Sequence, residues 1–214
     1  MICTSLQNKD YGELLEILSS PVIEMAEIRL DSCRLSDEEI RDIFGNSDTP
    51  LVATCRLSEN LDAAECERRL RLAAESGARF ADLEIEAPVQ MSKNFQKFCR
   101  QNGTEIIRSY HDFNGTPDME MLQKILARCF RYGADVAKIV CMCNSDEDAD
   151  RLESLYSIVL EDVPSLQGRL MAFGMGEKGR RSRMECLKRG APFSYAALNG
   201  NEATAPGQWT TEEM

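Results

Sequence analysis

Apolar positions along the chain form two kinds of segment that alternate. Short runs rich in Ile, Val and Leu predict strands, and longer stretches between them carry apolar residues at helical spacing. The predicted strands are Ile2–Leu6, Met25–Asp31, Leu51–Arg56, Phe80–Glu86, Glu105–His111, Asp135–Cys143, Arg169–Phe173 and Phe193–Leu198. This alternation is typical of α/β proteins, in which helices cover a parallel sheet.

The stretches between the strands carry signals for the start and end of helices. The clearest helices are predicted over residues 36–44, 62–76, 118–132 and 145–159. Each begins at Ser or Asp, which cap helix N-termini well, and the second and third end before a glycine. Near the end of the chain, Thr210 and Glu213 form another capping-box pair, but no helical pattern follows it.

Eight strands that alternate with helices predict a (β/α)8 TIM barrel, formed by a single domain over residues 1–214. A doubly wound open sheet is the alternative. A chain of 214 residues is short for a barrel, so the connections must be short. Because no helical pattern follows the eighth strand, the last helix of the barrel is expected to be missing or truncated.

Composition and charge narrow the classes of partner. The net charge of −11 argues against nonspecific binding to nucleic acid or anionic membranes. No apolar run approaches the roughly 20 residues of a membrane-spanning helix, and the first residues do not resemble a signal peptide. The nine cysteines are scattered in a pattern unlike a disulfide framework, which suits a reducing cytoplasm. We therefore expect a cytoplasmic protein.

Polar side chains recur on one face of several predicted strands, although strands covered by helices should be almost wholly apolar. If the apolar faces pack against helices, the polar faces point into the barrel. An ion-pair network that only stabilises the barrel is one interpretation. A ligand site is the better one for the whole set, because barrel active sites lie at the C-terminal ends of the strands. The polar faces carry Glu27, Arg29 and Asp31; Thr54 and Arg56; Asp82, Glu84 and Glu86; Ser109 and His111; and Lys138.

Two of these residues suggest imine chemistry. Lys138 lies in the middle of a strand, on a face that otherwise carries Val136 and Val140. Burial and nearby arginines would both disfavour its ammonium form and leave a neutral amine, which is a nucleophile towards ketones. His111, the one histidine of the chain, ends the preceding strand, where it could move protons while the iminium accepts electrons.

Metal and cofactor sites are not expected. One histidine excludes a His cluster, and Cys141 and Cys143 lack the spacing of a zinc site. Gly174 to Gly179 match a dinucleotide-binding glycine motif, but they occur late in the chain, and no acidic residue ends the next strand to bind a ribose. In the basic run that follows, an arginine directed at the barrel mouth would bind a carboxylate or a phosphate. The run consists of Lys178, Arg180, Arg181 and Arg183.

The ordered set of motifs resembles type I 3-dehydroquinate dehydratase, the imine-forming dehydratase of the shikimate pathway. Each motif alone is weak, but they follow in order through nearly the whole chain. The matching segments are Glu27–Asp31, Thr54–Arg56, Asp82–Glu84, Ser109–Phe113, Ala137–Ile139, Met175–Gly176, Ser182–Arg183 and Ala205–Gln208.

The resemblance implies a hydro-lyase that converts 3-dehydroquinate to 3-dehydroshikimate by syn elimination. Lys138 would form a Schiff base with the C3 ketone, and His111 would remove the C2 proton and then protonate the departing hydroxyl. Arg183 would bind the substrate carboxylate. The remaining substrate-binding residues would hold hydroxyls or position Lys138: Glu27, Arg29, Arg56, Thr204 and Gln208. The family needs no cofactor and is commonly a homodimer.

Two departures from the family pattern leave questions open. Thr204 replaces a serine that the family often has, and it keeps the hydroxyl. Glu59 is followed by Asn60 and Leu61 rather than by glycines, so the role of Glu59 is not assigned. Two other functions stay open at this point: a class I aldolase-like barrel that also forms an imine, and a catalytically silent barrel that binds an anionic metabolite.

Overall fold

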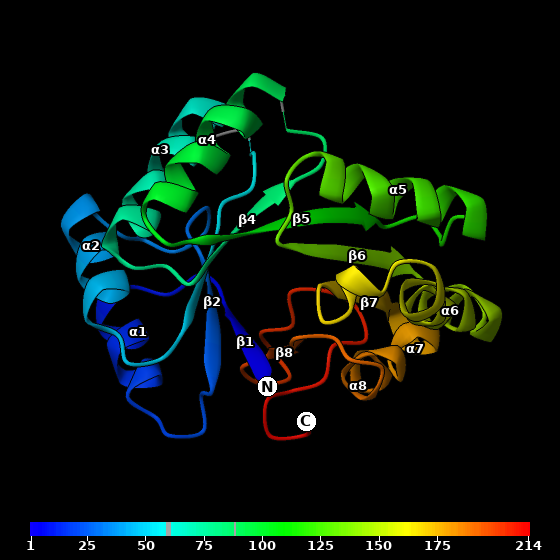
Figure 1. The fold of residues 1–214 in the computed structure, drawn as a ribbon. Helices are drawn as coiled ribbons and strands as arrows, with labels where there is room; N and C mark the ends of the chain where they lie inside the picture. Colours follow the sequence, from blue (N-terminus) through cyan, green and yellow to red (C-terminus); the bar gives the residue numbers. More distant parts are fainter. Residues whose placement is uncertain (59–60, 88) are drawn as a thin grey trace.

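The computed structural model describes residues 1–58, 61–87 and 89–214 and forms a nearly closed barrel of parallel strands (Figure 1). Eight strands pair in the order β7-β6-β5-β4-β3-β2-β1-β8, and β7 and β8 flank the open seam. The strands are β1 Ile2–Leu6, β2 Met25–Arg29, β3 Leu51–Thr54, β4 Phe80–Glu84, β5 Glu105–Asp112, β6 Val136–Met142, β7 Leu170–Met175 and β8 Ser194–Ala197. The predicted (β/α)8 fold is confirmed.

Helices cover the outside of the barrel. They are α1 Tyr11–Leu18, α2 Asp37–Asn46, α3 Ala63–Ser76, α4 Val89–Gln101, α5 Met119–Arg131, α6 Asp146–Asp162, α7 Gly176–Gly179 and α8 Ser182–Lys188, with a short 3-10 helix, η1, at Pro164–Leu166. Within residues 198–214 no helix follows β8, in agreement with the expectation that the last helix is missing or truncated. In the described ranges, no helix has the length and apolar content that a membrane crossing requires.

Local signals fixed most helix ends. Ser36 caps α2 in a capping box, and the Asp62 side chain caps α3. Helix α3 ends at Gly77, whose φ of +117° suits glycine, and any Cβ there would lie 2.9 Å from the Phe44 carbonyl oxygen. The sequence prediction did not include α1, although Asp10 and Glu13 form a capping box at its start.

Three strands end two residues earlier than predicted, at Arg29, Thr54 and Glu84. Hydrogen bonds from the Cys33 amide to the Arg29 carbonyl and from the Ala87 amide to the Glu84 carbonyl show that the chain turns there. The alternation of polar and apolar residues continues past the last paired residue of each strand, and such alternation predicts strand. Beyond the ladder, Arg56 lines the cavity and Asp31 pairs with the cavity-lining Arg29. Glu86 is exposed and does not line the cavity, so the prediction that it points into the barrel is wrong.

The strands divide the polar and apolar residues as predicted. One apolar cluster includes Ile28 and Ala53, and a second joins residues of β5 to β8 to single residues of β1 to β4. The latter are Cys3, Met25, Val52 and Phe80. The interior holds fully or almost fully buried polar side chains, a pattern opposite to that of an ordinary core. They are Ser5, Glu27, Thr54, Asp82, Ser109 and Lys138.

The segment after β8 is not helical, and hydrogen bonds attach it to the end of β8. The Ala197 amide donates to the Trp209 carbonyl at 2.8 Å, and the Thr211 amide donates to the Ala197 carbonyl at 2.8 Å. Thr210 and Glu213 make the reciprocal capping-box bonds, at 2.8 and 3.3 Å, but they close only a turn. The capping-box pair predicted from the sequence therefore forms, but no helix follows it.

Candidate active site

A cavity of about 270 Å³ opens at the C-terminal ends of the strands. All eight predicted site residues line it: Glu27, Arg29, Arg56, His111, Lys138, Arg183, Thr204 and Gln208. The strands β2, β5 and β6 present their polar faces here, and the loop after β3, helix α8 and the segment after β8 supply the rest. Glu59, whose role was left open, lies outside the described residues.

Lys138 lies in a cage of carboxylates. Its Nζ is 3.0 Å from Asp82 Oδ2 and 3.8 Å from Glu27 Oε1, and it is 3.9 Å from the centre of the Tyr195 ring. The side chain is 7% exposed. The sequence predicted an amine on an apolar wall beside arginines. This prediction is wrong about the nearest charged neighbours of the amine, because the inward positions of β2 and β4 bring two carboxylates to it.

Asp82 links Lys138 to the neighbouring cation. It accepts a hydrogen bond of 2.5 Å from Ser109 Oγ and pairs with Arg56 Nη2 at 2.9 Å. Burial by itself raises the pKa of Asp82, but the charges of Arg56 and Lys138 outweigh burial and hold that pKa well below its usual range. Asp82 is therefore a fixed negative charge under the cavity.

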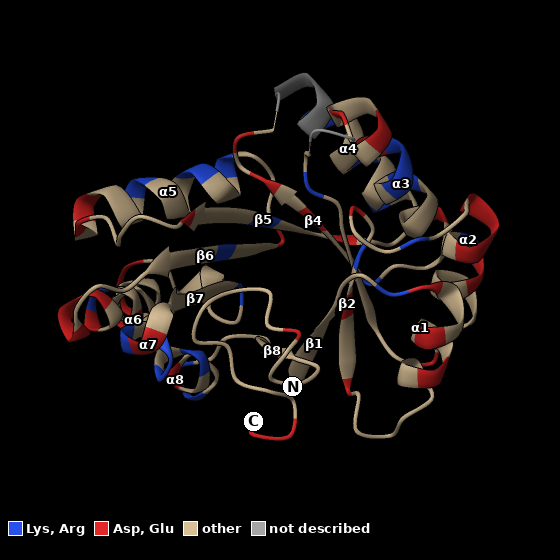
Figure 2. Cartoon of the chain, turned by 180° about the vertical axis from the view of Figure 1, so that it is seen from behind, with Lys and Arg blue, Asp and Glu red and all other residues tan. Residues whose placement is uncertain are grey.

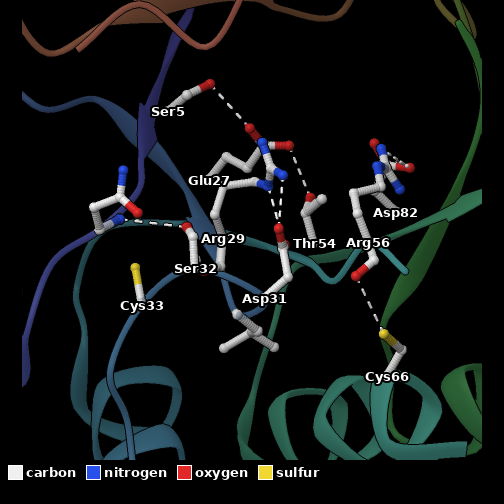
Figure 3. Close-up of polar contacts among 12 residues, drawn as sticks. Ser5, Glu27, Arg29, Asp31, Ser32, Cys33, Thr54, Arg56, Cys66 and Asp82 are labelled. Carbon is white, nitrogen blue, oxygen red and sulfur yellow. Dashed lines mark hydrogen bonds and ion pairs between the residues drawn. The ribbon is translucent and has the colours of Figure 1, made fainter. Parts of the chain in front are cut away.

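Glu27 and Arg29 are held by their own partners (Figure 3). Glu27 accepts hydrogen bonds from Ser5 Oγ at 2.9 Å and Thr54 Oγ1 at 2.7 Å. Arg29 makes a two-pronged pair with Asp31, at 3.1 and 2.7 Å. The buried carboxylate and the cavity-lining guanidinium are thus fixed in orientation before any ligand binds.

His111 follows Ser109 on the inward face of β5. In the ladder Ser109 is opposite Lys138 and His111 is opposite Val140, so the imidazole lies nearer the cavity mouth than Lys138. Burial lowers the pKa of His111, and the charges of Lys138 and Arg56 act in the same direction, while Glu84, with Oε1 3.7 Å from Nδ1, opposes them. The neutral imidazole is the dominant form near pH 7, and it can accept a proton.

Arg183 is a buried cation for which the described residues provide no counter-ion. The residue is 1% exposed, and neither Nε nor Nη2 has a hydrogen-bond partner in the described part of the chain. Its guanidinium carbon lies 4.9 Å from the centre of the Phe173 ring, and burial lowers the pKa of Arg183 to about 10. An unpaired buried charge is costly, so this arrangement indicates a slot for an anionic ligand group.

Thr204 and Gln208 reach the cavity from the segment after β8. The Gln208 Oε1 accepts hydrogen bonds from the Thr204 amide at 2.8 Å and from its hydroxyl at 3.0 Å. This segment passes the start of α7 at a glycine pair, since any Cβ on Gly207 would collide with the Gly176 carbonyl oxygen. Part of the glycine motif therefore serves close backbone packing.

The sequence did not predict the roles of several residues at the site. Asp82 and Glu84 were recognised as polar-face carboxylates, but their pairing with Lys138 and His111 depends on strand register across the barrel. Tyr195 carried no signal, because an aromatic residue in a buried strand is ordinary. No group of three or more His, Cys, Asp or Glu side chains that could hold a metal ion occurs in residues 1–58, 61–87 and 89–214.

The chain is similar to known proteins of one family over nearly its whole length. The family model of type I 3-dehydroquinase matches residues 2–214. A 3-dehydroquinate dehydratase of Desulfotalea psychrophila is 34% identical over 222 residues, which span 100% of this chain and 94% of that protein. Another from Methanocaldococcus jannaschii is 32% identical and covers 87% of this chain and 82% of its own length.

Solved structures show the same fold. The type I 3-dehydroquinate dehydratase of Clostridium difficile superposes with a TM-score of 0.85 at 21% identity, over 99% of this chain and 88% of that one. The enzyme from Geobacillus kaustophilus gives 0.84 at 24%, over 99% and 86%. A deoxyribose phosphate aldolase from Aeropyrum pernix reaches 0.59 at 14% identity, over 91% and 84%.

Proposed function

Because the chain belongs to the type I 3-dehydroquinase family, we propose that it dehydrates 3-dehydroquinate to 3-dehydroshikimate through an imine on Lys138. It acts as a hydro-lyase of the shikimate pathway. The observation that carries the assignment of residues is the arrangement of the cavity, in which Lys138, the neutral His111 and the unpaired Arg183 face one space.

Imine formation places a positive charge where the protein can stabilise it. The free amine of Lys138 attacks C3 of the substrate, the ketone oxygen takes up one proton from the nitrogen and one from solvent and leaves as water, and the nitrogen becomes an iminium. Asp82 and Glu27, 3.0 and 3.8 Å from Nζ, then face the new cation without moving. Fixed charges that match the charge of the intermediate lower the barrier without reorganisation.

His111 moves the protons. The iminium acidifies the adjacent C2 carbon, His111 takes the C2 proton, and the electron pair of that bond moves into the iminium to give an enamine. The enamine then expels the C1 hydroxyl, which His111 protonates. Water hydrolyses the conjugated imine and releases the product and the free amine. The net change is the loss of one water from the substrate.

Binding contacts fix the substrate over Lys138. Arg183 takes the carboxylate, because it is the buried guanidinium that lacks a protein partner in the described ranges. Arg29, Arg56, Thr204 and Gln208 present donors to the hydroxyls. Glu27 holds the Lys138 nitrogen in place. The carboxylate contact positions the ring, so that its ketone faces the amine.

Trapping tests the mechanism directly. Borohydride added with 3-dehydroquinate should reduce the imine, inactivate the protein irreversibly and add one ligand to the peptide that contains Lys138. Formation of the conjugated enone, followed by its ultraviolet absorbance, should be lost in Lys138→Ala. Turnover without trapping would indicate an enolate mechanism, and labelling at a different lysine would move the nucleophile. An aldolase would instead cleave a carbon–carbon bond and release two products.

Assembly and location are also part of the proposal. We propose a homodimer, on the resemblance to the family, and a cytoplasmic location, because all nine cysteines are buried free thiols that suit a reducing compartment. Light scattering coupled to size-exclusion chromatography would measure the mass. A mass near that of one 24.1 kDa chain would contradict the dimer.

A further inference from the structure

The segment that carries Thr204 and Gln208 is fastened to the barrel on both sides of the cavity. Its Pro206 carbonyl accepts a hydrogen bond of 2.9 Å from the Gly176 amide, at the end of β7. Further on, the backbone of residues 209–211 pairs with Ala197 at the end of β8. The segment therefore bridges the open seam between β7 and β8 at the mouth (Figure 1).

Trp209 and Arg180 make the side-chain part of this bridge. The guanidinium carbon of Arg180 lies 3.6 Å from the centre of the Trp209 ring, a close cation–π stack. The indole Nε1 in turn donates a hydrogen bond of 3.0 Å to the Arg180 carbonyl. One residue pair is thus joined twice, through the face of the indole and through its edge.

Glu213 completes the arrangement. Its carboxylate lies 3.3 Å from Arg180 Nη2, and it also accepts a hydrogen bond of 2.8 Å from the Thr210 amide. The capping-box turn therefore aims Glu213 at the same guanidinium that stacks on Trp209. We call Arg180, Trp209 and Glu213 the latch. The latch residues are absent from the cavity lining, so their effect on a ligand is indirect.

The latch joins two elements that line the cavity, the start of α8 with Arg183 and the segment with Thr204 and Gln208. Arg180 lies three residues before Arg183, in the turn that enters α8, and Trp209 directly follows Gln208. We propose that Arg180 and Trp209 are positioning residues, which hold Arg183 and the Thr204–Gln208 segment at a fixed separation and thereby set the affinity for the substrate. This inference rests on the proposed function for the identity of the substrate.

The expected effect is on binding more than on chemistry. Lys138 and His111 lie on β6 and β5 and pair with Asp82 and Glu84 of β4, so we expect these contacts to stay when the latch is lost. Without the latch, each ligand must order the segment when it binds, and this cost raises KM. A loss of general stability alone would not separate KM from kcat in this way.

The test compares two neighbouring arginines. Arg180→Ala removes the stack, whereas Arg181→Ala removes an arginine that is half exposed and pairs with Asp150 and Glu153 on α6. We expect Arg180→Ala to raise KM about five- to thirty-fold with kcat within about two-fold of wild type, because an effective cation–π contact is worth 1–2 kcal/mol. Arg181→Ala should leave both constants unchanged, and Trp209→Leu should reproduce the effect of Arg180→Ala.

The one tryptophan of the chain supplies a readout that needs no substrate. Acrylamide quenching of Trp209 fluorescence should increase in Arg180→Ala and stay at the wild-type value in Arg181→Ala. Equal KM values in the two arginine variants, or quenching that does not change in Arg180→Ala, would overturn the proposal. Wild-type protein that makes no enone would instead refute the proposed function, and the quenching comparison would then decide alone whether the latch holds the segment.

Discussion

Buried charged side chains in this barrel are stabilised by ion pairs with their immediate neighbours. Lys138, Asp82 and Arg56 form a chain of alternating charges, in which Asp82 touches both cations at 3.0 and 2.9 Å. The removal of Asp82 would leave each buried cation with only a more distant carboxylate, Glu27 at 3.8 Å from Lys138 and Glu84 at 3.5 Å from Arg56. Asp82 should therefore contribute strongly to the stability of the fold, although it is not one of the proposed substrate contacts.

We expect Asp82→Asn to lower the free energy of unfolding by about 3–5 kcal/mol, because Arg56 and Lys138 would keep their charges without a shared partner. Urea denaturation followed by circular dichroism measures this change. Glu86→Gln, at an exposed carboxylate just past the same strand, is the matched control and should alter stability by less than about 0.5 kcal/mol. Equal effects in the two variants would contradict the charge chain.

His111→Ala should lower kcat by about 10²–10⁴-fold and change KM little, because proton transfer occurs in the transition state and not in the bound ground state. Steady-state enone formation measures both constants. Borohydride trapping at Lys138 should persist in this variant, since imine formation precedes the C2 proton transfer. Wild-type turnover in His111→Ala would assign the proton transfers to another group.

The pH dependence tests the partner of His111. Burial lowers the pKa of His111 below its ordinary value, and Glu84 partly opposes that effect by favouring the imidazolium. The base must be neutral, so kcat/KM should fall only as the pH drops through the lowered pKa. Glu84→Gln removes the opposing influence and lowers the pKa further. The acidic limb of kcat/KM should therefore move to lower pH in this variant, and a move to higher pH would contradict the pairing.

At the scale of elements, the sequence predicted most of what local chemistry decides. All eight strands and the helices capped at Ser36, Asp62 and Asp118 were predicted, because alternation and capping are properties of short segments. The cage around Lys138 was not predicted, because it depends on how β2, β4 and β6 are staggered around the barrel. Polar faces indicate that an interior site exists, but they do not reveal which residues meet there.

The glycine pair at the barrel mouth allows a test at the element scale. Gly207 has φ +72°, and a Cβ there would collide with the Gly176 backbone, so Gly207→Ala should displace the segment that carries Thr204 and Gln208. We expect KM for 3-dehydroquinate to rise at least about tenfold, which corresponds to a loss of about 1.4 kcal/mol in binding. Gly200→Ala is the control, because nothing lies within 4 Å of its Cβ position. Identical KM values in the two variants would show that the segment does not depend on this glycine pair.

The whole molecule carries a net charge of −11, and its acidic residues are prominent on outer helices such as α1 and α2 (Figure 2). The cavity lining has more cations than carboxylates, since Glu27 and Glu84 stand beside Arg29, Arg56, Lys138 and Arg183. Arg29, Arg56 and Lys138 have carboxylate partners, so Arg183 stands out as the cation that the described residues leave without one. We therefore propose that this acidic protein binds its anionic substrate through Arg183.

This arrangement predicts that Arg183 favours ligand binding but does not stabilise the free protein. A buried guanidinium without a partner is a cost of the free state, and replacing buried charge with an apolar group of similar volume is often neutral or stabilising by about 1–4 kcal/mol. Arg183→Met should therefore leave the free energy of unfolding unchanged or raise it. Without the guanidinium the substrate carboxylate is buried unpaired, so affinity should fall by about 2–5 kcal/mol.

Urea unfolding with and without 3-dehydroshikimate measures both effects. At a ligand concentration of about 100 times Kd, the wild-type protein should gain about 2.7 kcal/mol, and Arg183→Met at the same concentration should gain almost nothing. Arg181→Met, at a half-exposed position two residues away, should keep the full gain. If Arg183→Met destabilised the free protein strongly, Arg183 would be part of the fold's own packing. If it kept the gain from ligand, the carboxylate would bind elsewhere, and Arg183 would lose its assigned role.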